Sequence, residues 1–454
     1  MGHTEQLARF ISDCTYAGLP HDVVAATKRC FLDWIGVTLG ATGDEAVKIL
    51  LGIVRDHGGK RQASIFGSRV KTSMLQAALV NGTMSHALDY DDAHNIIRTH
   101  PSAPLVPALF AAAEHLRLSG KELITAFVAG YETTVRVGYA LGKEYYERGW
   151  HATSVLGRLG AAAGTARLFR LPPDKTAVAL GLAATQAGGV RDVFGTMGKA
   201  FHAGKAAADG LFGALLAREG FTTAGDMLDE KSGFSQVFSR EYSPESIVKG
   251  LGVEYALGEV NFKPYAACLL VHPVIDAVLA IRDSHHPDHG QVEKIDIRVA
   301  PLNLRVTGDS DPQTAFQAKF SLPMAAAMAL VFGDANDSLF TTSVVHDPSV
   351  RAVMGKVRAA SDESMAENEA VVSVVMNDGQ QYSSHITAPK GNPGNPMTFV
   401  ELASKARDLS TKVLAPEVAE RVIDTVASLE KLENTAKLVR LCCPVDGQRG
   451  NGSR

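Results

Sequence analysis

Residues 23–39 read VVAATKRCFLDWIGVTL and carry the clearest structural signal in the chain. Apolar residues recur there at the three- and four-residue spacing of one broad helical face, which includes Phe31, Trp34 and Ile35. The stretch therefore predicts a helix that faces the core.

The same periodicity continues to about residue 265. It predicts further helices over residues 44–56, 73–88, 103–118, 121–141, 154–169, 175–186 and 205–218. Alanine and glycine are dense in these runs, as in GKAAADGLFGALLA (204–217). Because a glycine inside a helix costs up to about 1 kcal/mol, we expect close helix packing or backbone contact with a ligand.

The pattern changes after about residue 275. Residues 292–300 and 370–376 alternate apolar and polar side chains, which predicts strands, and Asn-Asp-Gly at 377–379 predicts a hairpin. Helices are predicted between and after these strands, over residues 322–330, 348–360, 399–408 and 417–432. The Pro/Gly/Asn-rich segment 390–398 ends the mixed region.

These patterns predict a mainly α fold with a discontinuous organisation. A large all-helical domain is expected over residues 1–270 and 396–454, interrupted by a smaller α+β lid domain over residues 271–395.

Composition limits the classes of protein that fit. Of 454 residues, 46% are hydrophobic and 21% charged, enough to bury a large core. The formal net charge is -4, so nucleic acid is not expected as a partner. Five cysteines without ligand spacing predict neither a disulfide framework nor a zinc site, and a reducing compartment fits best. With no secretory signal and no apolar run long enough to span a bilayer, we expect a soluble cytoplasmic protein without membrane contact.

The first of four polar segments is HALDYDDAHNIIRTHPSAP (86–104), which includes Asp89, Arg98, His100 and Ser102. Three aspartates and three histidines gathered in one segment allow three interpretations. They are a metal site, a metal-free acid–base centre in which an aspartate orients a histidine, and a solvated loop. Spacing alone does not choose among them.

The other segments add cations and a possible helix start. His151 stands at the beginning of an Ala/Gly-rich helix, where unpaired N–H groups suit a carboxylate, although a lone histidine is more often structural. The third segment, 188–210, places Arg191, Lys199 and His202 among glycines, a combination suited to binding carboxylates.

The fourth segment is NFKPYAACLLVHP (261–273), with Lys263 and Tyr265. Lys263 is either a surface side chain or a buried, paired cation. The sequence has no GxSxG, HExxH or P-loop motif, and its loose glycine pattern at 159–164 follows no strand, so serine-hydrolase, zinc-protease and dinucleotide-binding sites are not expected.

Taken together, the four segments resemble the MmgE/PrpD family, the group of 2-methylcitrate dehydratase, cis-aconitate decarboxylase and iminodisuccinate epimerase. The resemblance runs from FLDWIGVTLGA through NGTMSHALDYDDAH, RGWHATSVLG, FGTMGKAFHAG and NFKPYAACLLVHP to QAKFSLPMAAAMAL. It implies a homodimer that works without metal or organic cofactor, with a site between helical domain and lid. The residues implied as catalytic are Asp89, His100, His151, Lys199 and Lys263.

Within that resemblance, His100 is expected to transfer a proton and Asp89 to hold its ring. Lys199 and Lys263 are expected to bind carboxylates and stabilise the charge of a carbanion. His151 is expected to complete the pocket or supply a second proton. Further substrate contacts are predicted at Arg98, Ser102, Arg191, His202 and Tyr265.

The sequence departs from the family's patterns in segments that bear on which reaction is catalysed. Decarboxylase-like members carry Asp-Thr-Trp-His-Pro where this chain reads Asp-Ala-His-Asn at 92–95, and they have a lid tyrosine near 319–322, where none occurs here. These segments are closer to the epimerase-like members. We predict a lyase that dehydrates or decarboxylates a small di- or tricarboxylate. An epimerase of an iminodisuccinate-like acid is the alternative, and a non-catalytic acid-binding protein is a third possibility.

Overall fold

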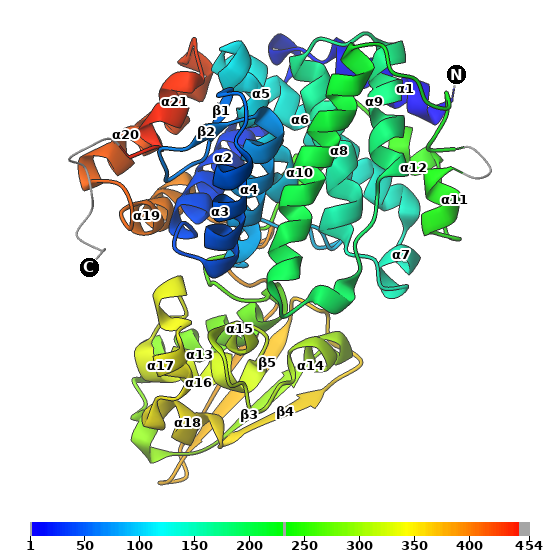
Figure 1. Ribbon diagram of the computed structural model, residues 1–454. Coiled ribbons are helices and arrows are strands. Elements are labelled where there is room, and N and C mark those ends of the chain that lie inside the picture. Colours follow the sequence, from blue (N-terminus) through cyan, green and yellow to red (C-terminus); the bar gives the residue numbers. More distant parts are fainter. Residues whose placement is uncertain (1, 230–232, 445–454) are drawn as a thin grey trace. The chain divides into compact units, whose positions relative to one another are not determined.

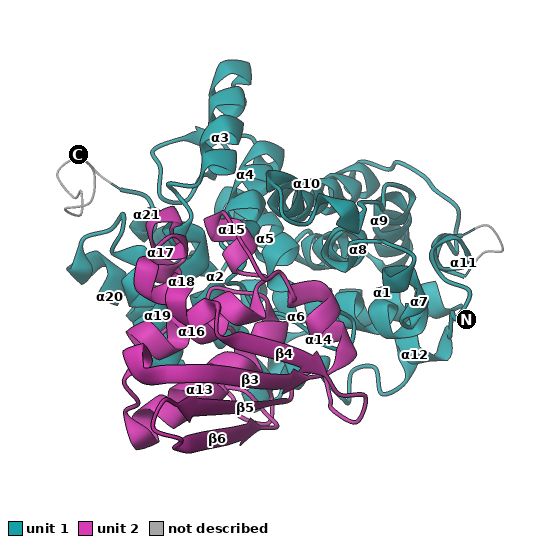
Figure 2. Cartoon of the chain, turned by 90° about the horizontal axis from the view of Figure 1, so that it is seen from below, with its two compact units in different colours: residues 1–261, 398–454 teal, residues 262–397 magenta. Residues whose placement is uncertain are grey.

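The computed structural model describes residues 2–229 and 233–444 (Figure 1). The chain divides into two compact units, coloured separately in Figure 2. Unit 1 comprises residues 1–261 and 398–454, and unit 2 comprises residues 262–397.

Unit 1 consists of helices and one short two-stranded ribbon. In chain order its elements are α1 (His3–Asp13), α2 (His21–Gly40), α3 (Glu45–His57), β1 (Ala63–Ser64), β2 (Lys71–Thr72), α4 (Met74–Ala87), α5 (Ser102–Leu116), α6 (Gly120–Leu141), α7 (Glu144–Glu147), α8 (Ala152–Leu168), α9 (Pro173–Thr185), α10 (Met197–Arg218), α11 (Phe234–Phe238), α12 (Glu245–Val248), α19 (Phe399–Ser410), α20 (Pro416–Ala427) and α21 (Ala436–Leu441).

Helix α2 is the predicted core helix, and aromatic side chains explain its burial. Trp34 contacts Phe66 and Phe110 with ring centroids 5.2 and 5.6 Å apart, and Phe31 contacts Phe110 and Phe127 at 5.5 and 5.1 Å. Rings at these separations add to the free energy gained by burying apolar area. Residues 23–39 therefore anchor α5 and α6 to α2.

Small residues let the central helices of unit 1 approach one another closely. Helix α10 packs against α4, α5, α8 and α9. Where α4 crosses α10, Gly82 faces Gly204, and a Cβ on Gly204 would lie 2.1 Å from the carbonyl oxygen of Leu79. The close packing expected from the Ala/Gly-rich runs is confirmed. Helix α10 also begins earlier than the predicted residue 205, at Met197.

The last helices of the chain complete unit 1. Helix α19 packs against α2, and a Cβ on Gly36 would lie 2.7 Å from the Cα of Ala406. Segments far apart in the sequence therefore share one core. In the described residues, no helix combines the length and apolar character needed to cross a membrane.

Unit 2 combines a mixed four-stranded sheet with helices. Its elements are α13 (His272–His285), β3 (Val292–Val299), α14 (Pro301–Thr307), α15 (Ala315–Ala318), α16 (Leu322–Phe332), α17 (Thr342–Val345), α18 (Pro348–Met354), β4 (Val357–Ser361), β5 (Ala370–Met376) and β6 (Gln381–Ile386). The strand order is β4-β3-β5-β6, with β3 and β4 parallel and the other pairs antiparallel.

The predicted strands and hairpin of unit 2 are confirmed, but one predicted helix is wrong in part. Strand β5 alternates buried and half-buried residues, and Asn377–Gly379 turns it into β6. Residues 348–360 were expected to form one helix, yet α18 ends at Met354 and 357–361 form β4. The physical reason is long-range, because β4 gains its hydrogen bonds from parallel pairing with β3. Helix and strand content together confirm the mainly α fold class.

The glycine contact between α4 and α10 gives a stability prediction. Gly204→Ala should lower the free energy of unfolding by about 1–3 kcal/mol, because its methyl group has no space. Gly52→Ala, within α3 and with nothing within 4 Å of the added Cβ, should instead stabilise the chain by about 0.5–1 kcal/mol. Urea unfolding followed by circular dichroism measures both. Equal effects of the two substitutions would contradict the packing described.

Candidate active site

The first polar segment forms the connection between α4 and α5 in unit 1. Two antiparallel bridges shape it, one joining His94 to Thr99 and one joining Ala93 to Asn261. Asp89 adopts a left-handed backbone conformation with φ 52°. Such a conformation is uncommon outside glycine, although aspartate tolerates it better than most residues. This bend lies directly after the end of α4.

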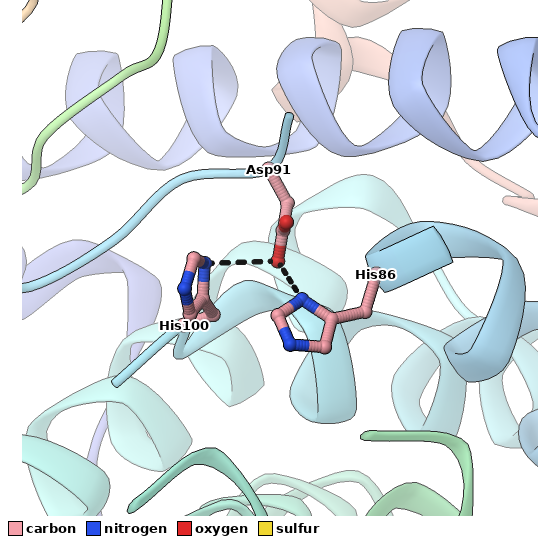
Figure 3. Close-up of side chains that lie close together, drawn as sticks. All are labelled: His86, Asp91 and His100. Carbon is pink, nitrogen blue, oxygen red and sulfur yellow. Dashed lines mark hydrogen bonds and ion pairs between the residues drawn. The ribbon is translucent and has the colours of Figure 1, made fainter. Parts of the chain in front are cut away.

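Asp91 lies between two histidines (Figure 3). Its Oδ2 atom is 2.9 Å from Nδ1 of His86, a hydrogen bond, and 3.2 Å from Nδ1 of His100. The two rings meet edge to face with centroids 4.6 Å apart. A carboxylate oxygen accepts hydrogen bonds, so the bond to His86 places a proton on Nδ1 of that ring and a lone pair on Nε2. The Nε2 atom of His86 is buried and has no hydrogen-bond partner.

Burial and mutual charge set the protonation of this group. Burial alone raises the pKa of the Asp91 carboxyl, but the adjacent His100 and His86 outweigh it and hold that pKa well below its ordinary value. Burial lowers the pKa of His86 to about 4, and the Lys199 charge adds to this effect while Asp91 opposes it. At neutral pH, Asp91 is therefore ionised and His86 is neutral.

Lys199 supplies positive charge from the first turn of α10. Its Nζ atom donates to Oδ1 of Asp89 at 2.8 Å, and both side chains are buried. The turn is capped by Thr196, whose hydroxyl accepts from the amide of Gly198. Because a helix N-terminus carries a partial positive charge, this turn and its lysine together favour an anion.

A second pair of histidines adjoins the first. His151 precedes α8, and its ring lies 5.9 Å from that of His86 and 5.3 Å from that of His202. The Nδ1 atoms of His151 and His202 are 3.0 Å apart. Phe194 packs edge to face on His151, with centroids 4.9 Å apart. Burial, followed by the charge of His86 and Lys199, holds the pKa of His151 well below its usual value, so this ring is neutral.

Comparison with known proteins matches both parts of the chain to one family. The MmgE/PrpD N-terminal domain matches residues 5–247, and the MmgE/PrpD C-terminal domain matches residues 265–431. The chain belongs to the MmgE/PrpD family. This confirms the resemblance found in the sequence, and the chain is an enzyme of the MmgE/PrpD type.

Curated relatives align with this MmgE/PrpD chain over almost its whole length. The cis-aconitate decarboxylase-like protein oryM of Aspergillus oryzae is 29% identical over 96% of both chains. The cis-aconitate decarboxylases of Mus musculus and Homo sapiens are 28% and 27% identical, each over 96% of this chain and over 93% and 94% of their own length.

The carboxylate that contacts His100 in this MmgE/PrpD chain differs from the expected one. Asp89 was predicted to hold the ring, but Asp91 lies against Nδ1 of His100, while Asp89 pairs with Lys199. The chain bends at Asp89, so the spacing along the sequence did not indicate which of the two carboxylates meets the ring. Sequence reasoning also missed His86 as a site residue. Its spacing of five residues from Asp91, across the end of a predicted helix, was the available signal.

Arg98 and Arg191 meet at one aromatic ring. Their guanidinium carbons lie 5.1 and 4.1 Å from the ring centroid of Tyr146, distances typical of cation–π contacts. Ser102, the first residue of α5, is buried, and its hydroxyl donates to Oδ2 of Asp92 at 2.5 Å. The contacts with substrate proposed for these three residues remain predictions.

Lys263 and Tyr265 belong to unit 2. The hydroxyl of Tyr265 donates to Asp276 at 2.5 Å within that unit. Their expected roles, carboxylate binding by Lys263 and substrate contact by Tyr265, likewise remain predictions.

One group of side chains in the described residues could hold a metal ion. His86, Asp91 and His100 each offer a ligand atom, and these atoms lie within 4.8 Å of one another. Two imidazoles and a carboxylate are ligands that several transition metals accept. The same positions also place Nδ1 of both imidazoles against one carboxylate oxygen, as in a proton-transfer site. The charge of Lys199 lowers the pKa of His86 and in the same way opposes a bound cation. The expectation of a metal-free site stays a prediction.

The histidine cluster predicts a pH dependence of stability. His86 takes up its proton near pH 6.5 in the unfolded chain and near 4 in the folded one. Between these values the unfolded state binds more protons, so stability falls as the pH is lowered from 7 to 4, by on the order of 3 kcal/mol for this group. His86→Gln should remove that part of the slope in urea unfolding, whereas His57→Gln, at an exposed position, should leave it. If the wild type and both variants lost stability equally as the pH was lowered, the lowered pKa assigned to His86 would be contradicted.

Proposed function

We propose that the chain is a lyase that decarboxylates a cis-aconitate-like tricarboxylate without a metal or organic cofactor. The relatives named above support decarboxylation as the first candidate. The observation that carries the proposal is the convergence, within unit 1, of Asp91 with two imidazoles beside the Lys199–Asp89 pair. This arrangement combines a proton-transfer centre with a binding site for a carboxylate.

The proposed reaction uses these groups in one sequence. The C–C bond to one carboxylate breaks, carbon dioxide leaves, and the electron pair stays on the carbon skeleton, delocalised towards a retained carboxylate. Lys199 and the N-terminus of α10 stabilise that developing charge, and such positioned donors are each worth about 10²–10³ in rate. His100 then delivers a proton to the carbon, with Asp91 holding its ring. His151, kept neutral, donates a hydrogen bond to the substrate. Lys263 is proposed to bind a second carboxylate.

An isomerase is the second candidate, because this chain lacks two sequence features of the decarboxylase-like members. The chain has Ala93 where decarboxylase-like members have threonine, and no tyrosine occurs at residues 319–322. Epimerisation of an iminodisuccinate-like dicarboxylate begins with removal of a proton next to a carboxylate, and the same histidines and lysine would stabilise that carbanion. The two reactions differ in which group leaves the carbon.

Turnover in D₂O separates these candidates. The purified protein is incubated with cis-aconitate, citrate, methylcitrate and iminodisuccinate, and NMR follows products and deuterium incorporation. A decarboxylase should release carbon dioxide from cis-aconitate and place deuterium on the product. His100→Ala and Lys199→Ala should each lower the rate by about 10²-fold or more.

The matched controls for that experiment are His57→Ala and Lys48→Ala, both on the surface of α3. They should retain the wild-type rate. Exchange of a substrate C–H proton with dicarboxylates, and no release of carbon dioxide, would favour the epimerase. Full activity of His100→Ala would overturn the assigned proton donor.

The proposal includes a homodimer in a cytoplasmic location. Large apolar side chains are exposed along α10, namely Met197, Phe201 and Phe212, and exposed apolar surface of this kind is typical of subunit interfaces. Unpaired cysteines favour a reducing compartment. Light scattering after gel filtration should give twice the chain mass, and Phe212→Glu should reduce it to one chain. A monomeric wild-type protein would contradict the homodimer.

A further inference from the structure

Lys405 is a buried cation on α19 that reaches the loop of the candidate active site. Its Nζ atom donates to Oδ1 of Asp33 at 2.6 Å and to the backbone carbonyl of Tyr90 at 2.7 Å. The same ammonium lies 3.8 Å from the centroid of the Tyr90 ring. Lys405, Asp33 and Tyr90 are all buried. Two of these interactions hold the ammonium against one residue of the loop, Tyr90, and the third pairs it with Asp33 on α2.

The position of Tyr90 gives these contacts their importance. Tyr90 stands between Asp89, which pairs with Lys199, and Asp91, which contacts His86 and His100. Asp89 is in the left-handed conformation with φ 52°, and such backbone conformations persist where surrounding contacts hold them. A fixed Tyr90 carbonyl determines the orientation of the peptide plane between Tyr90 and Asp91.

Asp33, the partner of Lys405, is a buried carboxylate on α2. Burial raises the pKa of the Asp33 carboxyl, whereas Lys405 and the backbone amide of Asp92 lower it. The pair thus contacts the backbone directly before Asp91, through the hydrogen bond from Lys405 to the carbonyl of Tyr90. Burying an ion pair costs desolvation free energy that can exceed the attraction between the two charges. Stability alone therefore does not explain why this pair lies beside the loop.

We propose that Lys405, paired with Asp33, is a positioning residue that holds the Asp89–Asp92 loop in the conformation that aims Asp91 at the two histidines. The inference rests on the proposed function for its kinetic consequence. Its structural consequence, the state of the His86 and His100 rings, is measurable without any substrate. Lys405 contributes this from a helix that follows unit 2 in the chain.

The test uses the double variant Lys405→Met with Asp33→Asn, which leaves no lone buried charge. The matched control is Lys28→Met with Glu430→Gln. Lys28 also lies on α2, and it pairs with Glu430 at 3.1 Å and donates to the carbonyl of Ala427 at 2.9 Å. Both doubles remove an ion pair between α2 and the C-terminal segment together with a hydrogen bond from the lysine to a backbone carbonyl. In the control that carbonyl belongs to Ala427, so the loop is left untouched.

Two measurements are made on folded, full-length protein. Imidazole ¹⁵N NMR signals, assigned from their loss in His86→Gln and His100→Gln, report the proton position on each ring. Steady-state kinetics reports kcat and KM for the acid that the wild-type protein turns over. In the Lys405/Asp33 variant we expect both ring signals to shift and kcat to fall about 10–100-fold, because a misplaced catalytic group costs up to about 10² in rate. KM should change less.

The control double should keep wild-type ring signals and kcat. Wild-type ring signals and kcat in the Lys405/Asp33 variant would overturn the inference, even if its unfolding midpoint fell. Lys405→Met alone gives a further comparison. If adding Asp33→Asn to it restored wild-type kcat, the harm would come from a lone carboxylate, and the positioning role would be refuted. If no acid is turned over, the proposed function fails while the NMR signals still decide the role of Lys405.

Discussion

A carboxylate in a protein interior is stable only where donors or cations lie against it, and the buried carboxylate on which the site of unit 1 depends is Asp91. Its exposed fraction is 1%, and it keeps its negative charge because His86 and His100 lie against one of its oxygens. The remaining parts of the site follow from this interaction. The end of α4 supplies one ring, the residues before α5 supply the other, and the loop between them brings the carboxylate to both.

Close helix packing makes that arrangement possible. Glycines at the contact of α4 and α10 bring the N-terminal turn of α10, with Lys199, to the side of the cluster where Asp89 lies. His151 reaches the cluster from the start of α8, which packs on the same α10. Each glycine lowers the stability of its own helix. Together these glycines allow the close packing that brings α4, the loop after it, α8 and α10 around one group of imidazoles.

Most of the fold could be predicted from the sequence, whereas the pairing of side chains within the site could be predicted only in part. Helical periodicity and the Asn-Asp-Gly turn are local signals, and they predicted α2 and the β5–β6 hairpin correctly. Strand β4 was missed because its pairing with β3 joins residues far apart in the chain. Asp89 and Asp91 are the same type of residue two positions apart, so the sequence did not indicate which of them would meet His100 and which would pair with Lys199.

Long-range ion pairs were the least predictable feature. Lys405 occurs in FVELASKARDLS, a sequence typical of a helix with a solvated face, yet its partner Asp33 is 372 residues away. No local pattern distinguishes such a lysine from an exposed one. The family motifs compensate for this at Lys199, whose partner in the structure, Asp89, also belongs to a motif. Lys405 lies outside the motifs that carried the resemblance, so nothing in the sequence singled it out.

The charge state of the cluster bears on the chemistry that the proposed reaction requires. Cations placed against every carboxylate of a substrate would stabilise the starting acid as much as the transition state, and uniform binding of that kind does not raise kcat. In unit 1, His86 and His151 are neutral, and the charge of Lys199 is opposed by Asp89. A leaving carboxylate near His86 and His151 would lose its hydration without gaining a full counter-charge from them, and it would be released from that penalty on becoming carbon dioxide. The charge that grows on the retained carboxylate would meet Lys199 and the α10 terminus. In the proposed reaction, this asymmetry would favour loss of a charged group as a neutral molecule, which is the property that distinguishes decarboxylation from epimerisation.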